Sequence, residues 1–458
     1  MVISLPGIVL VDDKKVDLDL IQDSFTSSGF PCFAIHYKND DPANETGIDH
    51  VNLGMLNPRV IITDLNLQEL QVDAAKLVGP IAEVLKKLTT EGPYVLYFWS
   101  KNVSIVEKVM ELIEERYSDS IHYPLNWGIL DKTHYNSRAD ELIERVNELF
   151  SENPVFNALF GWENRVSTSA QRTTDSLFKL ATPQKSTGIK DFQDQTTKKL
   201  QEMLAQIGNE AIGQKNAKDE PEIAIELGLD PVLRDHIRST WEHVDRAAWL
   251  NAATGIGTSL SVDDDIKAHL NSFYHLEHVS SESPKNKRGT WISLSPDYFD
   301  LLTNSVKIKQ NLGKDIKELL HEEFLDSNQG SRLEREAVRT SVKLGFLEVS
   351  AECDEAQRKT KLHRYFLSAL IPKEHANFTY FRDRSSDTAH AGIYRLPNLI
   401  IDSNEYIVKV SFMYPIGIIP DVNKWLGEPL FRLKDQILAD ISFKASQHTS
   451  RPGIIRFD

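Results

Sequence analysis

Cysteine is scarce in this chain, since its 458 residues include only Cys32 and Cys353. Two cysteines this far apart form neither a disulfide framework nor a cysteine-based zinc site, and they are typical of a protein in a reducing cytosol. Long apolar runs are also missing: no stretch approaches the ~20 apolar residues of a membrane span, and the run before Asp12 is too short for a signal peptide. We therefore expect a cytoplasmic protein with no membrane partner.

Excess positive charge is absent as well. The chain has 52 Lys and Arg against 67 Asp and Glu, which gives a formal net charge of −15. Affinity for nucleic-acid phosphates depends on clustered Lys and Arg, so this balance argues against nucleic acid as a partner. The sequence also lacks a P-loop, a Gly-rich dinucleotide fingerprint and a Gly-x-Ser-x-Gly motif, and nothing in it indicates an ATP-binding kinase core.

Four short β-branched or aromatic runs in the first third of the chain end in polar residues. These runs are 8–13, 60–64, 94–100 and 128–132. The carboxyl ends of parallel strands meet at one edge of a sheet, where such sheets bind ligands. We therefore predict that Asp12, Asp13, Asp64, Ser100 and Lys132 form one site.

The predicted site has the composition of a phosphoryl-accepting centre. Three carboxylates in one crevice repel each other, so a divalent cation is expected among them, and hard oxygen ligands favour Mg²⁺. Asp64 would bind the metal and attack phosphorus, while Lys132 would neutralise oxygen charge and Ser100 would donate a hydrogen bond to the phosphoryl group. Each residue also has a simpler interpretation: Asp12 or Asp13 as a helix cap, Lys132 as a solvated lysine and Ser100 as a turn residue.

The predicted elements alternate regularly over the same region. Strands are expected near 8–12, 32–37, 59–64, 94–99 and 126–131, and helices near 16–28, 45–56, 73–89, 103–117 and 137–150. With the acid pair, the single acid, the hydroxyl and the lysine on strands one, three, four and five, residues 1–150 resemble a divergent receiver domain of a two-component response regulator. This resemblance implies a flavodoxin-like (βα)5 α/β domain with a parallel five-stranded sheet.

The resemblance also implies roles and a partner. The implied roles are phosphoacceptor for Asp64, Mg²⁺ ligand for Asp12, Asp13, Asp64 and the backbone carbonyl of Asn66, switch hydroxyl for Ser100 and phosphate-binding lysine for Lys132. The partner would be a sensor histidine kinase, and the chain would be a signalling protein and not an enzyme. The sequence departs from the family pattern at Lys101, where a small residue is usual, at Thr133, where proline is usual, and at Ile129, where a switch aromatic is usual.

Sequence signals are weaker beyond residue 150. The Ser-, Thr- and Gln-containing range 151–190 is expected to be a linker, 191–350 a mostly helical middle region and 351–458 an α+β domain. In the last range, strands are expected at 378–381, 392–395, 399–401 and 406–412, and an amphipathic helix over 427–444.

Some polar residues of the second half invite a functional interpretation but lack partners in the sequence. The histidine pairs His236/His243 and His275/His278 have no third or fourth ligand that would make a zinc site. The turn from Arg382 through Asp383 and Asp387 to His390 has no nucleophile with an oriented base, so a salt-bridged loop is the expected structure.

A receiver followed by a long region without an output motif is similar to the effector-less receiver proteins of Detocs-type bacterial anti-phage defence phosphorelays. The similarity implies a phosphate sink that accepts phosphoryl groups from the histidine kinase and so protects a second response regulator of the same system. Three alternatives stay open. The carboxy-terminal region could be a cryptic effector enzyme, it could bind a partner or form a homodimer under control of phosphorylation, or the receiver could be a pseudo-receiver that only mediates interactions.

Overall fold

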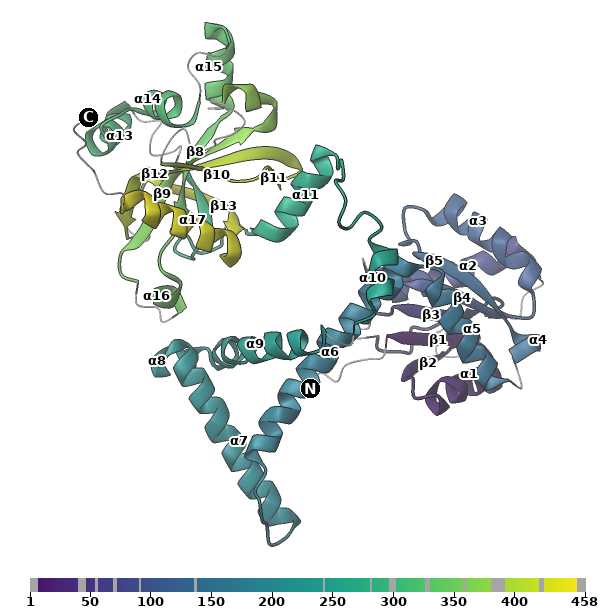
Figure 1. The fold of residues 1–458 in the computed structure, drawn as a ribbon. Coiled ribbons are helices and arrows are strands. Elements are labelled where there is room, and N and C mark those ends of the chain that lie inside the picture. Colours follow the sequence, from purple (N-terminus) through teal and green to yellow (C-terminus); the bar gives the residue numbers. More distant parts are fainter. Residues whose placement is uncertain are drawn as a thin grey trace. The chain divides into compact units, whose positions relative to one another are not determined.

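The protein is described by a computed structural model that covers most of the chain (Figure 1). The described residues are 7–39, 47–53, 57–68, 72–89, 92–135, 138–241, 244–280, 282–295, 302–325, 330–356, 360–379, 392–419 and 424–450. The chain divides into two compact units, Met1–Leu180 with Pro231–Thr258 and Ala181–Asp230 with Ser259–Asp458. None of the described helices is both long and apolar enough to cross a membrane.

A five-stranded, all-parallel sheet forms the centre of the first unit. Its strands are β1 (Ile8–Asp12), β2 (Cys32–His36), β3 (Val60–Asp64), β4 (Val95–Ser100) and β5 (Asn126–Asp131). Their order is β2-β1-β3-β4-β5. The predicted strands agree with these bounds to within one residue at each end, so the expected α/β unit with a parallel five-stranded sheet is confirmed.

Helices cover both faces of this sheet. They are α1 (Lys15–Ser27), α2 (Ala74–Leu88), α3 (Val106–Tyr117, after the 3₁₀ turn η1, Val103–Ile105), α4 (Lys132–Tyr135) and α5 (Ala139–Ser151). Alternate residues of β1 point to opposite faces: Val9 and Val11 pack with α2 and α3, whereas Leu10 packs with α1 and α5. Because both faces are buried, the strands are almost continuously apolar up to their polar ends.

The helix predicted over residues 45–56 is wrong for the part that the structure describes. Residues 47–53 form a bridge and turns. Gly47 exchanges two backbone hydrogen bonds with Lys38 and has a φ of 79°, outside the right-handed helical region. The apolar spacing in this stretch therefore reflects contacts with the core and not a helical period.

The linker expected over 151–190 is also wrong as a description of secondary structure, because α6 (Pro154–Ala181) occupies most of it. Ser169 and Thr173 donate hydrogen bonds to carbonyls four residues back, at 2.8 and 2.9 Å, and both side chains are buried. Hydroxyl groups satisfied in this way do not interrupt a helix. The next helices are α7 (Ile189–Ile212), α8 (Gln214–Asp219), α9 (Pro221–Ser239) and α10 (Arg246–Ala252).

The second unit contains an eight-stranded antiparallel sheet. Its strands are β6 (Leu276–His278), β7 (Thr290–Leu294), β8 (Lys343–Glu348), β9 (His363–Pro372), β10 (Ile393–Arg395), β11 (Leu399–Ile401), β12 (Asn404–Ile418) and β13 (Leu426–Leu433). The order is β10-β12-β9-β8-β7-β13-β6, with β11 also paired to β12. The sheet therefore begins at residue 276, and the expected mostly helical region 191–350 contains three of its strands.

Further helices of the second unit follow α10 in the chain. They are α11 (Asp264–His275), α13 (Leu302–Leu312), α14 (Ile316–Leu319), the π-helical turn η3 (Leu320–Phe324), α15 (Arg332–Ser341), α16 (Glu352–Ala356), the 3₁₀ segment η4 (Lys373–Phe378) and α17 (Asp435–Thr449). Apolar residues of α17 pack on one face of the antiparallel sheet, and those of α13, α14 and α15 pack on the other.

Two predictions for the last hundred residues need correction. Residues 426–433 form β13, and the helix begins only at Asp435, because Pro429 lacks the amide hydrogen that a helix interior requires and lies at a register shift of the sheet. Phe378 ends η4 and Thr379 forms a bridge with Leu325, so the described part of 378–381 is not a regular strand. The predicted strands at 392–395, 399–401 and 406–412 correspond to β10, β11 and part of β12.

Candidate functional site

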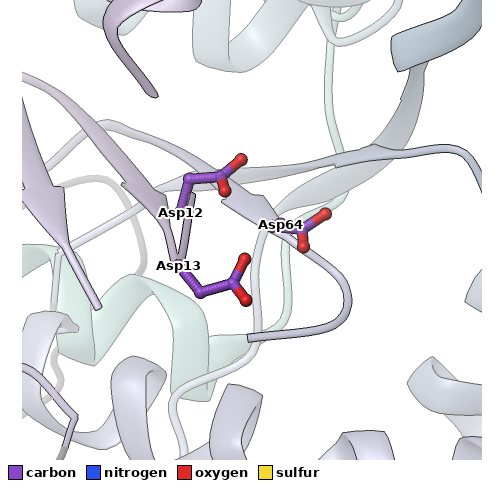
Figure 2. A group of neighbouring side chains, drawn as sticks. All are labelled: Asp12, Asp13 and Asp64. Carbon is purple, nitrogen blue, oxygen red and sulfur yellow. The ribbon is translucent and has the colours of Figure 1, made fainter. Parts of the chain in front are cut away.

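Three carboxylates converge at the carboxyl edge of the parallel sheet. Asp12 ends β1, Asp13 follows it, and Asp64 ends the neighbouring strand β3. One carboxylate oxygen of each residue lies within 4.8 Å of the others, and Figure 2 shows the three carboxylates pointing into a shared space. Among the described residues, this is the one group of acids, histidines or cysteines arranged to hold a metal ion.

Lys132 forms ion pairs with two residues of this acidic group and with Asp17. Its Nζ is 2.7 Å from Asp12, 3.1 Å from Asp64 and 3.1 Å from Asp17, and its side chain is only 4% exposed. Burial by itself lowers the pKa of a lysine, but the charges of Asp64 and Asp12 outweigh it and raise the pKa of Lys132. The lysine is therefore charged, and the interpretation of Lys132 as a solvated surface residue is wrong.

Asp12 is almost completely buried, with 1% of its surface exposed. Burial, reinforced by the nearby charge of Asp64, raises the pKa of Asp12 to about 7 despite the opposing effect of Lys132. Asp12 accepts a 2.8 Å hydrogen bond from the amide of Lys14, but Lys14 is itself the N-cap residue of α1. Helix capping thus does not account for the position of Asp12.

Asp13 has an unsatisfied oxygen. Its Oδ1 is buried and receives no hydrogen bond from the described residues, whereas Oδ2 accepts a long 3.4 Å bond from Asn39. Burial and the charge of Asp64 raise the pKa of Asp13. A buried carboxylate oxygen without a donor, in a group of three acids, fits a cation, because hard divalent cations bind such oxygens.

Asp64 and Ser100 complete the set predicted from the sequence. Asp64 is 7% exposed, and its Oδ2 accepts a 3.3 Å hydrogen bond from the amide of Asn66. Ser100 is buried at the end of β4, opposite Asp131 of β5, and its Oγ accepts a 3.1 Å bond from the amide of Asn102. The bond from Asn102 fits the interpretation of Ser100 as a turn residue, so the switch role of Ser100 stays a prediction. The backbone carbonyl of Asn66 as a metal ligand also stays a prediction.

The structure accounts for one departure from the family pattern and adds one residue. Thr133 donates from both its amide and its hydroxyl to Asp131, at 2.8 and 2.7 Å, and so fixes the start of α4 where the family has proline. Asp17, in the first turn of α1, pairs with Lys132 and was not predicted. The available signal was an acid in the first turn of the helix that follows the acid pair.

The described histidines of the predicted pairs do not add to this site. His236 accepts or donates a 2.8 Å hydrogen bond with Thr173 across α6 and α9, which is a packing role. His275 ends α11 and His278 ends β6, and no metal-holding group of described residues includes them. His243 and the residues Arg382, Asp383, Asp387 and His390 lie outside the described residues.

Comparisons with known proteins do not show which family the chain belongs to. No protein-family model matches it, and no curated protein does either. One solved structure, described as the yeast Spc42 trimeric coiled coil (amino acids 181–211) in a fusion, has 19% sequence identity over 33% of this chain and 85% of that chain. Its TM-score of 0.20 is too low for that likeness to carry any structural argument.

Proposed function

We propose that the first unit is a flavodoxin-like receiver domain that takes a phosphoryl group from a partner histidine kinase onto Asp64 in a Mg²⁺-dependent reaction. One observation carries this proposal: Asp12, Asp13 and Asp64 converge at the carboxyl edge of a parallel sheet, where the buried ammonium of Lys132 pairs with Asp12 and Asp64. Strand order β2-β1-β3-β4-β5 supports it, since doubly wound sheets of this order bind ligands at the switch point beside the first strand.

The residues divide the chemistry between them. Asp64 is the nucleophile: one carboxylate oxygen forms a bond to phosphorus while the bond from phosphorus to the imidazole nitrogen of the donor breaks. Lys132 is close enough to Asp64 to neutralise charge on the transferred oxygens, and Ser100 would donate to one of them. Asp12, Asp13 and Asp64 would hold Mg²⁺, with the carbonyl of Asn66 as a further ligand, and the bound ion would supply the remaining charge neutralisation.

The proposed product is a protein-bound acyl phosphate, so the chain is a phosphoacceptor without a free substrate. We propose that it acts as a phosphate sink in a bacterial defence phosphorelay, with a second response regulator of that system as a further partner. The large antiparallel unit could instead be a phosphorylation-controlled effector or adaptor. The phosphate sink requires phosphotransfer without a second activity, whereas the effector requires a turnover that appears on phosphorylation.

A pseudo-receiver is the second candidate, and one observation favours it. Lys132 already neutralises Asp12 and Asp64 directly, at 2.7 and 3.1 Å, as a lysine does when it replaces a metal ion. The two candidates differ in whether a cation and a phosphoryl group displace this lysine.

Phosphotransfer from candidate sensor kinases tests the proposal. The full-length protein is incubated with each kinase, ATP and Mg²⁺, and its mobility is followed on a phosphate-affinity gel. We expect a shifted band for the wild type that disappears in Asp64→Ala and persists in Asp19→Asn, which removes an exposed acid of α1. A shift that persists in Asp64→Ala would place the phosphoryl group elsewhere.

A further inference from the structure

A cavity of about 390 Å³ lies in the first unit between α6 and residues that include Thr240, Asp245 and, from α10, Trp249. Its walls carry Trp162, Arg165 and Arg172 from α6 and Trp249 from α10. None of its lining residues belongs to the acidic site. Ligand sites of proteins have volumes of about 300–1,000 Å³ and combine apolar walls with a few polar groups, as this cavity does.

The cavity carries two positively charged side chains, although the chain as a whole is negatively charged. Arg165 and Arg172 are seven positions apart on α6, two helical turns, and therefore lie on one side of it. Among the described residues neither arginine has an acidic partner, although the chain has a net charge of −15. The Nε of Arg165 is buried and donates to no described group. A buried guanidinium nitrogen without an acceptor points to an anion that occupies the cavity.

The one acid of the cavity is engaged elsewhere. Oδ1 of Asp245 accepts hydrogen bonds from the amides of Ala247 and Ala248, at 2.8 and 3.2 Å, and thereby caps α10. Asp245 is therefore held by α10 and forms no ion pair with the arginines among the described residues. The two guanidinium groups keep their positive charge available for a ligand.

The two tryptophans add an aromatic component. Trp162 is 48% exposed, which is a large exposure for so apolar a side chain, and Trp249 is half-buried in the opposite wall. Indole rings bind planar aromatic groups by stacking, and arginines bind phosphates through paired N–H groups. A cavity with both components is complementary to a ligand that is aromatic at one end and anionic at the other.

The wall of the cavity is preformed on its α6 side. Thr173 is 8% exposed, and its hydroxyl lies 2.8 Å from Nδ1 of His236, which ties α6 to the end of α9. Ser169, one turn earlier on α6, is completely buried. These small side chains let the helices approach closely, so Arg165 and Arg172 project from a fixed helix and not from a loop.

We propose that this cavity binds a mononucleotide, with the phosphates on Arg165 and Arg172 and the base against Trp162 or Trp249. This site is independent of the phosphoacceptor site and would make the first unit responsive to a nucleotide.

Titration of the full-length protein with ADP tests this proposal, with tryptophan fluorescence and calorimetry as readouts. EDTA is included, so that a Mg²⁺–nucleotide complex does not form at the acidic site. We expect saturable quenching, about tenfold weaker binding in Arg165→Gln and in Arg172→Gln, and unchanged binding in Arg116→Gln, which removes an exposed arginine of α3. Adenosine and inorganic phosphate, each alone, should bind more weakly than ADP.

Three results would overturn the assignment. The first is the absence of saturable ADP binding to protein whose circular dichroism and melting curve show it to be folded. The second is equal affinity in the folded double variant Arg165→Gln/Arg172→Gln. The third is inorganic phosphate binding as tightly as ADP, since the aromatic walls would then contribute nothing.

Discussion

At the scale of single residues, the charge balance of the acidic site depends on Lys132. Its ammonium is the one cation within 3.1 Å of Asp12, Asp17 and Asp64 among the described residues. An unpaired buried charge is far more costly than a buried pair, and here three carboxylates share one partner. Lys132 therefore has a structural role in the metal-free protein as well as the proposed role in phosphoryl binding.

We predict that Lys132→Ala destabilises the metal-free protein by roughly 3 kcal/mol, because it leaves Asp12 and Asp64 buried without a counter-charge. Mg²⁺ should recover part of this loss, since a divalent cation can replace the missing charge. Urea unfolding with and without Mg²⁺ measures both effects. The matched control is Lys101→Ala, an exposed neighbour of Ser100, for which we expect a change within about 0.5 kcal/mol. Equal stability of Lys132→Ala and wild type would contradict the account of the charge balance.

The pKa of Asp12 predicts how the site responds to pH. Burial raises this pKa from 3.8 to about 7, so between these values the folded protein retains a proton that the unfolded chain has released. The contribution of Asp12 to stability therefore falls as pH rises from about 4 to about 7. Because a cation binds the ionised carboxylate, Mg²⁺ affinity should rise by up to tenfold per pH unit below about 7 and level off above it.

Calorimetric titration with Mg²⁺ at several pH values checks this prediction. The expected affinity curve bends near pH 7 in the wild type. In Asp12→Asn the bend should vanish and the affinity should be lower at every pH. An affinity that is independent of pH between 5 and 8 in the wild type would show that Asp12 is ionised throughout.

Sequence reasoning found four of the five residues that lie together in the charged site, and it missed Asp17. Asp12, Asp13, Asp64 and Lys132 were predictable because each lies directly at the end of a strongly apolar strand, where the parallel topology fixes its position. Asp17 was not predictable, because its ion pair with Lys132 depends on where the first turn of α1 lies relative to the end of β5, which periodicity does not show. The role of Ser100 depends on a movement and stays a prediction.

At the scale of elements, the sequence predicted the strands and most helices of the first unit, where each element has a single clear period. It failed where tertiary contacts override local pattern. Gly47 pairs with Lys38 in a stretch that reads as helical, and the hydroxyl-rich segment around Ser169 is helical because its hydroxyls bond to the helix itself. In the second unit, β6 has only three residues, and α13, α14 and α15 separate β7 from β8, so the sheet had no continuous signal.

The antiparallel sheet offers an element-scale prediction at Gly345 of β8. A Cβ at this position would collide with the carbonyl of Ile292 and the ring of Trp291, both on the neighbouring strand β7. We predict that Gly345→Ala destabilises the second unit by about 2–3 kcal/mol, because the two strands must separate. Gly161→Ala in α6 is the matched control, since its Cβ would meet no described group within 4 Å outside its own helix, and it should stabilise the first unit by about 0.5–1 kcal/mol. Differential scanning calorimetry measures both, and a neutral Gly345→Ala would contradict the close approach of β7 and β8.

At the scale of the whole molecule, the chain consists of two units with separate cores, one parallel and one antiparallel. The domain boundaries predicted from the sequence, near residues 150, 190 and 350, differ from this division. In the structure, α6 and the segment from Pro231 to Thr258 belong to the same unit as the parallel sheet. Contacts between segments far apart in the sequence decide such a division, and composition does not reveal them. The domain limits given by the sequence stay predictions.

We predict that Mg²⁺ stabilises only the first unit. Calorimetry of the full-length protein should show two transitions, and Gly345→Ala should identify the one that belongs to the antiparallel unit by lowering it. Mg²⁺ at about 100 times its dissociation constant should stabilise the other transition by about 2.7 kcal/mol. The effect should be absent in the double variant Asp12→Asn/Asp13→Asn. If Mg²⁺ shifts both transitions equally, or shifts that double variant, the cation binds elsewhere.

The central claim is that Asp64 accepts a phosphoryl group beside a bound Mg²⁺ ion. Beryllofluoride tests it most directly, since it adds to a phosphoacceptor aspartate without requiring the cognate kinase. Fluorine NMR of the full-length protein should show bound beryllofluoride only when Mg²⁺ is present, with no bound signal in Asp64→Ala and an unchanged signal in Asp19→Asn. Absence of a bound signal in the folded wild type with Mg²⁺ would contradict the phosphoacceptor function and leave the first unit a pseudo-receiver.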